Sequence, residues 1–582
     1  MFLPTTPEEI RRLGWDALDV ILVSGDSYID SPHIGAALIG KTLLKAGFRV
    51  GIIAQPDGST AADITRLGEP RLFWGVTAGS VDSMVANYTA TGKRRRTDDY
   101  TPGGINNRRP DRACIAYTNW IRRYTKTTRP IVLGGIEASL RRIAHYDFWD
   151  NTVRRSILFD AKADFLLYGM AERTVVALAK ALHAETDPRQ LPGLCYLAKQ
   201  KPPTHLALPS YEEVRADKHA FIQMFQTFYE HTDPVRAKGL CQQHGERWLV
   251  QNPPPPYETQ QELDEIYNLD FEREQHPFYQ RHGAVKALET IRFSITTHRG
   301  CYGECNFCAI AVHEGRAVRW RSINSVLQEA RQIIRHPRFK GYITDLGGPT
   351  ANMYGIECAE KSTRGACRNK RCLYPQICPK LSVNHGPLLE LMRRVRELPG
   401  IKKVCVGSGI RHDLVLADAC CGDRYLAELV AHHVSGQLKI APEHVVPHVL
   451  AKMGKPGVQA LLNFKRKFEQ ATHAARRPQF LTYYLLAAHP GCTDKDMHVL
   501  KRFTTRTLKL RPEQVQVFTP TPSTYSTLMF YTETDPFTGQ AIYVEKNPKR
   551  RERQKLLLTG LGSAAPKAPH RSATSDGTTA QR

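Results

Sequence analysis

The chain has 582 residues, of which 41% are hydrophobic and 24% charged, so it is long enough for several domains with sizeable cores. Its formal net charge of +24 favours anionic partners without identifying one, which leaves nucleic acid open as a partner. No apolar run is long enough to span a bilayer, and the first residues lack the apolar core of a signal peptide. We therefore expect a cytoplasmic protein without a membrane partner.

Residues 1–195 are predicted to form an N-terminal, Rossmann-like α/β domain. Five apolar runs alternate with helical patterns, which favours a doubly wound parallel sheet. These runs are LDVILVSG, RVGIIA, RLFWGV, PIVLGG and ADFLLYG. Ligands of such sheets bind beyond the carboxyl ends of the strands, where Gly25, Gly134, Gly135 and Gly169 fall.

Residues 196–285 carry a weaker pattern and are interpreted as a connector that packs on its neighbours. The four consecutive prolines Pro253–Pro256 exclude regular helix and central strand there, whereas a helix is predicted around residues 218–229. The tail at residues 546–582 is basic and then rich in Ala, Pro, Ser, Thr and Gly, a composition that predicts disorder.

Residues 286–545 return to alternating strands and helices. Six strand candidates occur in the order IRFSITT, GYITDLG, IKKVCVGS, GQLKIA, FLTYYLLAA and QVQVFTP, with helical patterns between them. Six β/α units fit an open, partial (β/α)6 barrel, because a closed barrel would need eight.

The fourteen cysteines are clustered, since seven of them lie between Cys301 and Cys378. In a long chain from a reducing compartment, such clusters bind metal or do chemistry more often than they form disulfides. The first group has C-x3-C-x2-C spacing and directly follows the first barrel strand; it consists of Cys301, Cys305 and Cys308.

Three thiolates with this spacing can hold one face of a cubane 4Fe-4S cluster and leave the fourth iron open. Gly300 and Gly303 let the backbone bend close to the cluster. The alternatives are a zinc site or a chance spacing. Zinc sites generally use four ligands in two pairs, and this spacing is different.

The cysteine loop, with Phe307 before its last cysteine, resembles that of the radical SAM (S-adenosylmethionine) superfamily, and the whole chain is similar to its YgiQ family. The shared phrases cover most of residues 15–530 and include GGIEASLRRIAHYDFWDN, HRGCYGECNFCAI, DLGGPTANMY, APEH, HPGCT and VFTPTPSTYSTLMFYT. The resemblance implies an enzyme that cleaves S-adenosylmethionine to a 5′-deoxyadenosyl radical, with a reductant such as flavodoxin or ferredoxin. It leaves the substrate and the catalytic residue unknown.

The same resemblance suggests where S-adenosylmethionine binds. Gly347 and Gly348 match a Gly-Gly-Glu turn that binds the methionyl amino group, with Pro349 in place of the acid. Ser408 and Arg411, after the third strand, suit the carboxylate, unless Arg411 is a surface residue after a turn. Glu443, after the fourth strand, suits the ribose hydroxyls, unless it only begins a helix.

A second cysteine group follows the second barrel strand. Its four thiols could close a zinc site or an auxiliary iron–sulfur cluster, or they could be unrelated thiols on a long loop. The group consists of Cys358, Cys367, Cys372 and Cys378.

The N-terminal sheet is similar to the cobalamin-binding domains of many radical SAM enzymes. Those domains use an Asp-x-His-x-x-Gly loop, whereas residues 30–35 read DSPHIG, with His33 shifted by one position. We therefore do not expect cobalamin. The alternative to a radical enzyme is a metal-binding, nucleic-acid-binding protein without radical chemistry, which the net charge would suit.

Overall fold

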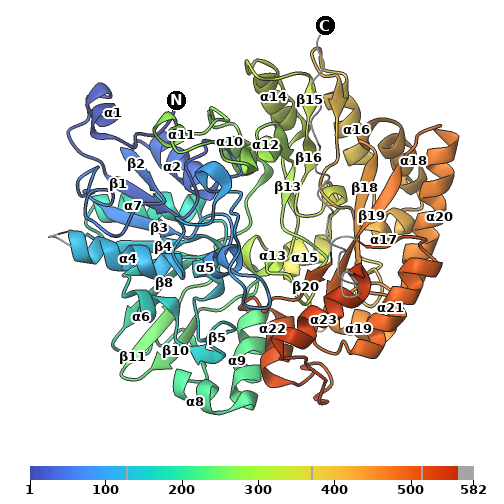
Figure 1. Cartoon of the computed structure of the whole chain (residues 1–582). Helices are drawn as coiled ribbons and strands as arrows, with labels where there is room; N and C mark the ends of the chain where they lie inside the picture. The colour runs from blue at the N-terminus through green and yellow to red at the C-terminus, as the bar shows by residue number, and fades with distance from the viewer. Residues whose placement is uncertain (126–128, 369–370, 513–514, 561–582) are drawn as a thin grey trace, which may run out of the picture.

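The computed structural model describes residues 1–125, 129–368, 371–512 and 515–560. The N-terminal half, blue to green in Figure 1, lies beside the C-terminal half, yellow to red. Within the described residues, no helix is long and apolar enough to cross a membrane.

A nine-stranded sheet organises the N-terminal half, and its first five strands confirm the predicted parallel arrangement. They stand in the order β2-β1-β3-β4-β7. Both faces of these strands are covered, which is why their sequences are continuous apolar runs. Their bounds are β1 Val20–Ser24, β2 Val50–Ala54, β3 Phe73–Thr77, β4 Ile131–Gly134 and β7 Phe165–Leu167.

Alternate residues of these strands pack on opposite faces, as the pleat of a strand requires. Leu22 of β1 packs with α2 (Gly35–Lys45) and α7 (Glu172–His183) in one buried cluster. Its neighbour Val23 points the other way and packs with α4 (Ala113–Tyr124) and α6 (Ile157–Ala161) in another. The sheet therefore lies between two helical layers.

The boundary predicted at residue 195 does not coincide with the end of the sheet. The same sheet continues through β8, β11, β10 and β9, with β7–β8, β8–β11 and β10–β11 antiparallel. Three of these strands lie in the region interpreted as a connector, so the sheet is mixed and extends to residue 251. Their bounds are β8 Leu194–Ala198, β9 Leu206–Leu208, β10 Leu240–His244 and β11 Arg247–Gln251. The predicted helix is present as α9, Lys218–Glu230.

All six predicted strand regions of the C-terminal half contain strands, and their neighbouring pairs run parallel. β12 pairs with β16, β15 with β17, β18 with β19 and β19 with β20, while a parallel bridge joins Ile410 to Ile440. Their bounds are β12 Ser294–Thr296, β15 Tyr342–Ile343, β16 Asp345–Gly347, β17 Lys403–Val404, β18 Gln437–Glu443, β19 Phe480–Ala487 and β20 Gln516–Val517.

Helices alternate with these strands and bury their apolar sides in a common core. The core helices are α14 Ile323–Ile334, α16 Gly386–Arg396, α18 Gly422–Glu428 with a π-helical extension Leu429–His433, and α20 Val458–Ala474. Helix α21, Asp494–Arg506, instead buries Met497 and Leu500 in the cluster that includes Val23. The shorter elements are α1 Pro7–Arg12, α3 Ser83–Asn87, α5 Gly135–Leu140, β5 His145–Asp147, β6 Thr152–Arg154, α8 Tyr211–Ala216, α10 Gln260–Tyr267, α11 Pro277–Gln280, α12 Ala287–Ile291, β13 His298–Arg299, α13 Ile310–His313, β14 Arg319–Trp320, α15 Ala359–Arg364, α17 His412–Ala417, α19 Pro447–Met453 and α22 Tyr525–Thr532.

The prediction of a disordered tail from residue 546 is wrong for its first part. Residues Pro548–Thr559 form helix α23, which the side chain of Asn547 caps. Arg551 is fully buried, donates to the carbonyl of Ala90 at 2.9 Å and has its guanidinium 4.9 Å from the ring centroid of Phe148. These contacts order a basic segment that its composition alone leaves exposed. Residues 561–582 lie outside the described residues.

Candidate active site

The first cysteine group lies on the loop that joins β13 to α13, just after the first strand of the C-terminal half. Gly300 has a φ of +76°. A Cβ atom at this position would lie 2.1 Å from the carbonyl oxygen of Ala317, so only glycine fits there. The loop therefore turns tightly around its first cysteine.

Two of the three thiols of this loop lie beside Gly303, and the third, of Cys308, lies near both of them. A Cβ atom on Gly303 would lie 3.2 Å from the Sγ of Cys301 and 3.7 Å from that of Cys305. Burial, and then the neighbouring thiolate of Cys305, raise the pKa of Cys308 to about 12. The amide of Gly303 donates to the Sγ of Cys301 at 3.3 Å. Thiols that crowd one another in a buried loop suit a metal that replaces their protons.

The three thiols of the loop match the ligand type of an iron–sulfur cluster. In the part of the chain that the structure describes, no three His, Cys, Asp or Glu side chains are placed to hold one metal ion together. The thiolates of a cubane each bind a different iron, so they surround the cluster instead of converging on one point. The donor set and the loop geometry therefore fit a 4Fe-4S group.

Glu304, within the same loop, anchors the loop to the rest of the protein. Its buried carboxylate pairs with Arg316 at 2.9 Å and Lys361 at 2.8 Å, and it accepts a hydrogen bond from the hydroxyl of Tyr229 at 3.1 Å. Burial acts to raise the pKa of Glu304, but Lys361 and Arg316 prevail and lower it to about 2. Sequence reasoning missed this residue, although it is the only acid between the cysteines of the motif.

Gly347, Gly348 and Ser408, three of the residues predicted to bind S-adenosylmethionine, line one cavity of about 350 Å³. We call it the strand-end cavity. Asp345, which the sequence analysis overlooked, holds its wall by accepting from the amide of Gly407 at 2.8 Å and from the hydroxyl of Ser408. A Cβ atom on Gly348 would lie 2.8 Å from the carbonyl oxygen of His298, so this position has no room for a side chain.

Arg411 lies next to the cysteine loop and outside the lining of the strand-end cavity. Its Nε donates to Asp413 at 2.8 Å, and its Nη1 lies 3.6 Å from the Sγ of Cys305. Two sides of the guanidinium are thus used by Asp413 and by a cysteine. The carboxylate-binding role predicted for Arg411 stays a prediction, and the geometry also suits stabilisation of an anionic cluster.

Glu443 is buried at the end of β18, where a bulge in the pairing with β19 gives it a φ of +66°. Burial raises its pKa, and the Nζ of Lys455 lies 3.6 Å from its carboxylate. The same Nζ lies 5.8 Å from the ring centroid of Phe307 in the cysteine loop. Glu443 is therefore a strand-end residue near the loop, as predicted, and its contact with ribose stays a prediction.

The second cysteine group is only partly gathered. Cys358, Cys372 and Cys378 are buried in one cluster, whereas Cys367 is exposed. The amide of Cys378 donates to the carbonyl of Cys372 at 2.8 Å, and Lys361 donates to the Sγ of Cys372 at 3.5 Å. A metal here stays a prediction, since it would need Cys367 to turn inward.

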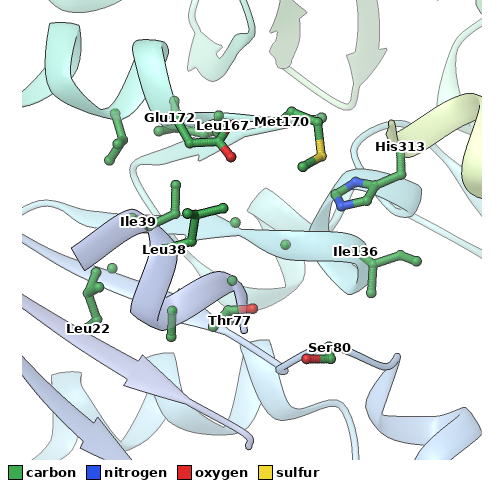
Figure 2. Close-up of a pocket in the computed structure, with 18 of the residues that line it drawn as sticks. Leu22, Leu38, Ile39, Thr77, Ser80, Ile136, Leu167, Met170, Glu172 and His313 are labelled. Carbon is green, nitrogen blue, oxygen red and sulfur yellow. The ribbon is translucent and has the colours of Figure 1, made fainter. Parts of the chain in front are cut away.

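A second cavity, of about 330 Å³, lies over the N-terminal sheet near the carboxyl ends of its strands (Figure 2). We call it the sheet cavity. It shares six lining residues with the strand-end cavity, so the two adjoin: Pro32, His33, Met170, Tyr267, Arg299 and Glu314. His33 stands just before α2, and its Nε2 lies 3.3 Å from the hydroxyl of Thr296 in β12.

A family model described as "Radical SAM N-terminal" matches residues 2–294, which is half of the chain. The chain is thus a protein of the radical SAM class. A UPF0313 protein of Fusobacterium nucleatum is 55% identical over 96% of this chain and 98% of its own length. A UPF0313 protein of Thermotoga maritima is 50% identical over 95% and 98%. The chain belongs to the UPF0313 family of radical SAM proteins, the YgiQ family, which confirms the resemblance drawn from its motifs.

Among solved structures, the methyltransferase TsrM from Kitasatospora setae, with cobalamin and a [4Fe-4S] cluster bound, is similar at 15% identity and a TM-score of 0.49, over 88% of this chain and 78% of that one. The enzyme OxsB, with aqua-cobalamin and S-adenosylmethionine bound, is similar at 14% identity and a TM-score of 0.49, over 93% and 61%. These likenesses are too distant to assign a ligand or a reaction to this chain.

Proposed function

We propose that this chain is an enzyme that binds a 4Fe-4S cluster through Cys301, Cys305 and Cys308 and binds S-adenosylmethionine in the strand-end cavity. One observation carries the proposal: the cysteine loop and this cavity adjoin. The Sγ of Cys301 lies 3.7 Å from the hydroxyl of Thr350. The preceding residue, Pro349, lines the cavity together with Gly347 and Gly348.

The arrangement of the strands supports the proposal. We interpret the six parallel strand regions as a partial (β/α)6 barrel, whose loops at the carboxyl ends of the strands carry the site. The residues concerned stand at or after the ends of β12, β16, β17 and β18. Residues far apart in the sequence thereby reach one end of the barrel.

When bound and reduced, such a cluster supplies one electron that splits the sulfonium of S-adenosylmethionine into methionine and a 5′-deoxyadenosyl radical. The three cysteines would hold the cluster and would leave one iron open for the amino acid part of the cofactor. The backbone of Gly347 and Gly348 offers carbonyls for the amino group. Arg411 and Lys455 place positive charge near the cluster loop and counter its negative charge. A low-potential donor such as flavodoxin or ferredoxin would supply the electron.

The cysteines favour a reducing compartment, and we infer a cytoplasmic location. All fourteen are free thiols, and disulfides are rare where thiols are kept reduced. For the second cysteine group, zinc and an auxiliary iron–sulfur cluster both remain compatible with the thiolate ligands.

We do not include cobalamin in the proposal. The Nδ1 of His33 lies 3.4 Å from the hydroxyl of Ser31 and its Nε2 3.3 Å from that of Thr296. The imidazole therefore already has a hydroxyl neighbour at each ring nitrogen. An assay for bound corrinoid in protein produced with added hydroxocobalamin would test this expectation.

The test of the main proposal is anaerobic reconstitution of the full chain with ferrous iron and sulfide, followed by reduction with dithionite in the presence of S-adenosylmethionine. We expect four irons per chain at the first cysteine group, a reducible paramagnetic centre and formation of 5′-deoxyadenosine. Stable zinc without iron, together with tight and salt-sensitive binding of RNA, would support the alternative of a metal-bound nucleic-acid-binding protein.

A further inference from the structure

The sheet cavity lies where an open α/β sheet places its ligands. In the order β2-β1-β3-β4-β7, the chain reverses its direction of winding between β1 and β3, and a crevice forms at the carboxyl ends next to such a point. The cavity is bounded by β1, β3, β4 and β7 on one side and by α2 and α7 on the other. Figure 2 draws Leu38 and Ile39 of α2 with Thr77 and Met170 among the lining residues, and shows His313 of α13 reaching in from the right.

The body of the cavity is apolar. Its walls are formed by aliphatic side chains of the strands and of the two helices, among them Leu22, Leu38, Ile39, Val132, Leu167 and Val175. Gly134 leaves extra room, because a Cβ atom there would meet only the carbonyl oxygen of Leu167, at 3.9 Å. A volume of about 330 Å³ is within the range of small-molecule sites.

The charged side chains that line the cavity are Glu172, Arg299 and Glu314. The carboxylate of Glu314 accepts a hydrogen bond from the amide of Gly300 at 3.1 Å, and burial raises its pKa. Arg299, the only Lys or Arg among the described lining residues, is paired with Glu172 at 2.7 Å. Burial lowers the pKa of His33 and of His313 to about 4, so both imidazoles are neutral at pH 7. The Nδ1 of His313 has no hydrogen-bond partner within the described structure. An anionic ligand would lose its hydration here without gaining an unpaired cation, whereas a neutral polar group can bond to His313.

We propose that the sheet cavity binds the substrate of the radical chemistry, and that this substrate is a small, mainly apolar organic molecule without negative charge instead of a nucleic acid or a protein. The assignment as substrate rests on the proposed function, because it uses the adjoining strand-end cavity as the place of S-adenosylmethionine. A molecule in the sheet cavity would lie against the six shared lining residues, directly beside the cofactor.

The test uses N-phenyl-1-naphthylamine, a neutral apolar dye that becomes fluorescent in an apolar site. We expect one saturable site per full-length chain. Gly134→Leu fills the cavity from the sheet, and we expect at least a tenfold weaker affinity. Gly457→Leu is the matched control, because Gly457 is exposed with an ordinary φ of −66° and no atom near its Cβ position; we expect unchanged affinity. Ile39→Trp fills the cavity from α2 and is the second test should Gly134→Leu not fold.

Charge is tested with 8-anilino-1-naphthalenesulfonate, which differs from the neutral dye only by its sulfonate. We expect it to bind at least tenfold more weakly. The proposal is overturned if every cavity-filling variant that folds binds the neutral dye with the affinity of the unmodified chain. It is also overturned if the sulfonate dye binds as tightly as the neutral dye, or if single-stranded RNA displaces the neutral dye.

The dye is titrated into metal-free protein and into cluster-loaded protein. Failure to assemble a cluster would refute the proposed function and leave the dye result standing. Failure to bind the dye would refute the small-molecule site and leave the cluster assay standing. The two proposals therefore fail separately.

Discussion

Replacing Glu304 with glutamine removes one negative charge from the cysteine loop and keeps the size of the side chain. In the unmodified chain this carboxylate is buried between Arg316 and Lys361. After the replacement, two buried cations lose their counter-ion, and both remain tied to elements outside the loop. We expect the loop to open more often and to hold its cluster less well.

The size of the effect follows from the pKa of Glu304, which falls from 4.5 to about 2 on folding. Each pKa unit corresponds to about 1.4 kcal/mol, so the carboxylate contributes about 3 kcal/mol at neutral pH. This agrees with the cost of about 3–5 kcal/mol for removing one partner from a buried ion pair. Because the folded pKa is the lower one, the stabilisation is present above pH 4.5 and is lost as the pH falls toward 2.

Hydrogen–deuterium exchange measures this contribution locally, which suits a chain with several cores whose unfolding is not two-state. For amides of residues 300–316 that exchange through loop opening, about 3 kcal/mol corresponds to an acceleration of about a hundredfold. Amides of β1 in the same sample serve as an internal reference. The control is Glu397→Gln, since Glu397 is an exposed partner of Arg393 at 3.0 Å. We expect it to change stability by less than about 1 kcal/mol and to leave the cysteine loop unaffected.

The reasoning is refuted if Glu304→Gln exchanges its loop amides at the unmodified rate between pH 6 and 8. It is also refuted if loss of protection is equally large in β1, because the effect would then be global and not centred on the loop.

Three further replacements test the site and the fold. Cys305→Ala should abolish iron incorporation, whereas Cys420→Ala, at an exposed cysteine outside both groups, should retain it. Iron is measured after reconstitution, and equal iron contents in the two variants would contradict the ligand assignment. Asp345→Ala removes the acceptor that holds Gly407 and Ser408. It should raise the Kd for S-adenosylmethionine about tenfold, or about 1.4 kcal/mol, at unchanged iron content. An unchanged Kd, measured by equilibrium dialysis, would mean that the cofactor binds outside the strand-end cavity. Arg551→Ala should lower the melting temperature because it removes a fully buried side chain that donates to two backbone carbonyls. Arg553→Ala, at a side chain that is 66% exposed, should leave the melting temperature unchanged. Equal melting curves for the two variants would mean that α23 contributes little to stability.

The sequence predicted the strands best where both faces of a strand are buried. β1 to β4 are continuous apolar runs, and their parallel pairing follows from the helices between them. The extension of the sheet escaped prediction because β9 is a short edge strand and its neighbour β10 carries polar residues such as Gln242 and Gln243, so both resemble loop sequence. For α23, the basic composition predicted disorder, which the structure contradicts. The segment is ordered because aromatic rings and backbone carbonyls from distant segments surround Arg551.

In the candidate site, too, the features that depend on local sequence could be predicted and those that depend on distant residues could not. Cysteine spacing is local, and so is the glycine pair at the end of β16, and both could be found in the sequence. The ion pair between Glu304 and Lys361 joins residues 57 positions apart, and no local pattern links them. The sheet cavity could not be predicted for the same reason, because its walls combine α2, four strands and α13.

Helix α23 also constrains how the molecule is made. The contact between Arg551 and Ala90 joins residues 461 positions apart, so a ribosome must deliver nearly the entire chain before this contact can form. During synthesis, the carbonyl of Ala90 therefore lacks its hydrogen bond from Arg551 until α23 has been made. A fragment expressed without α23 would lack this hydrogen bond permanently, so the N-terminal half is better studied within the whole chain than alone.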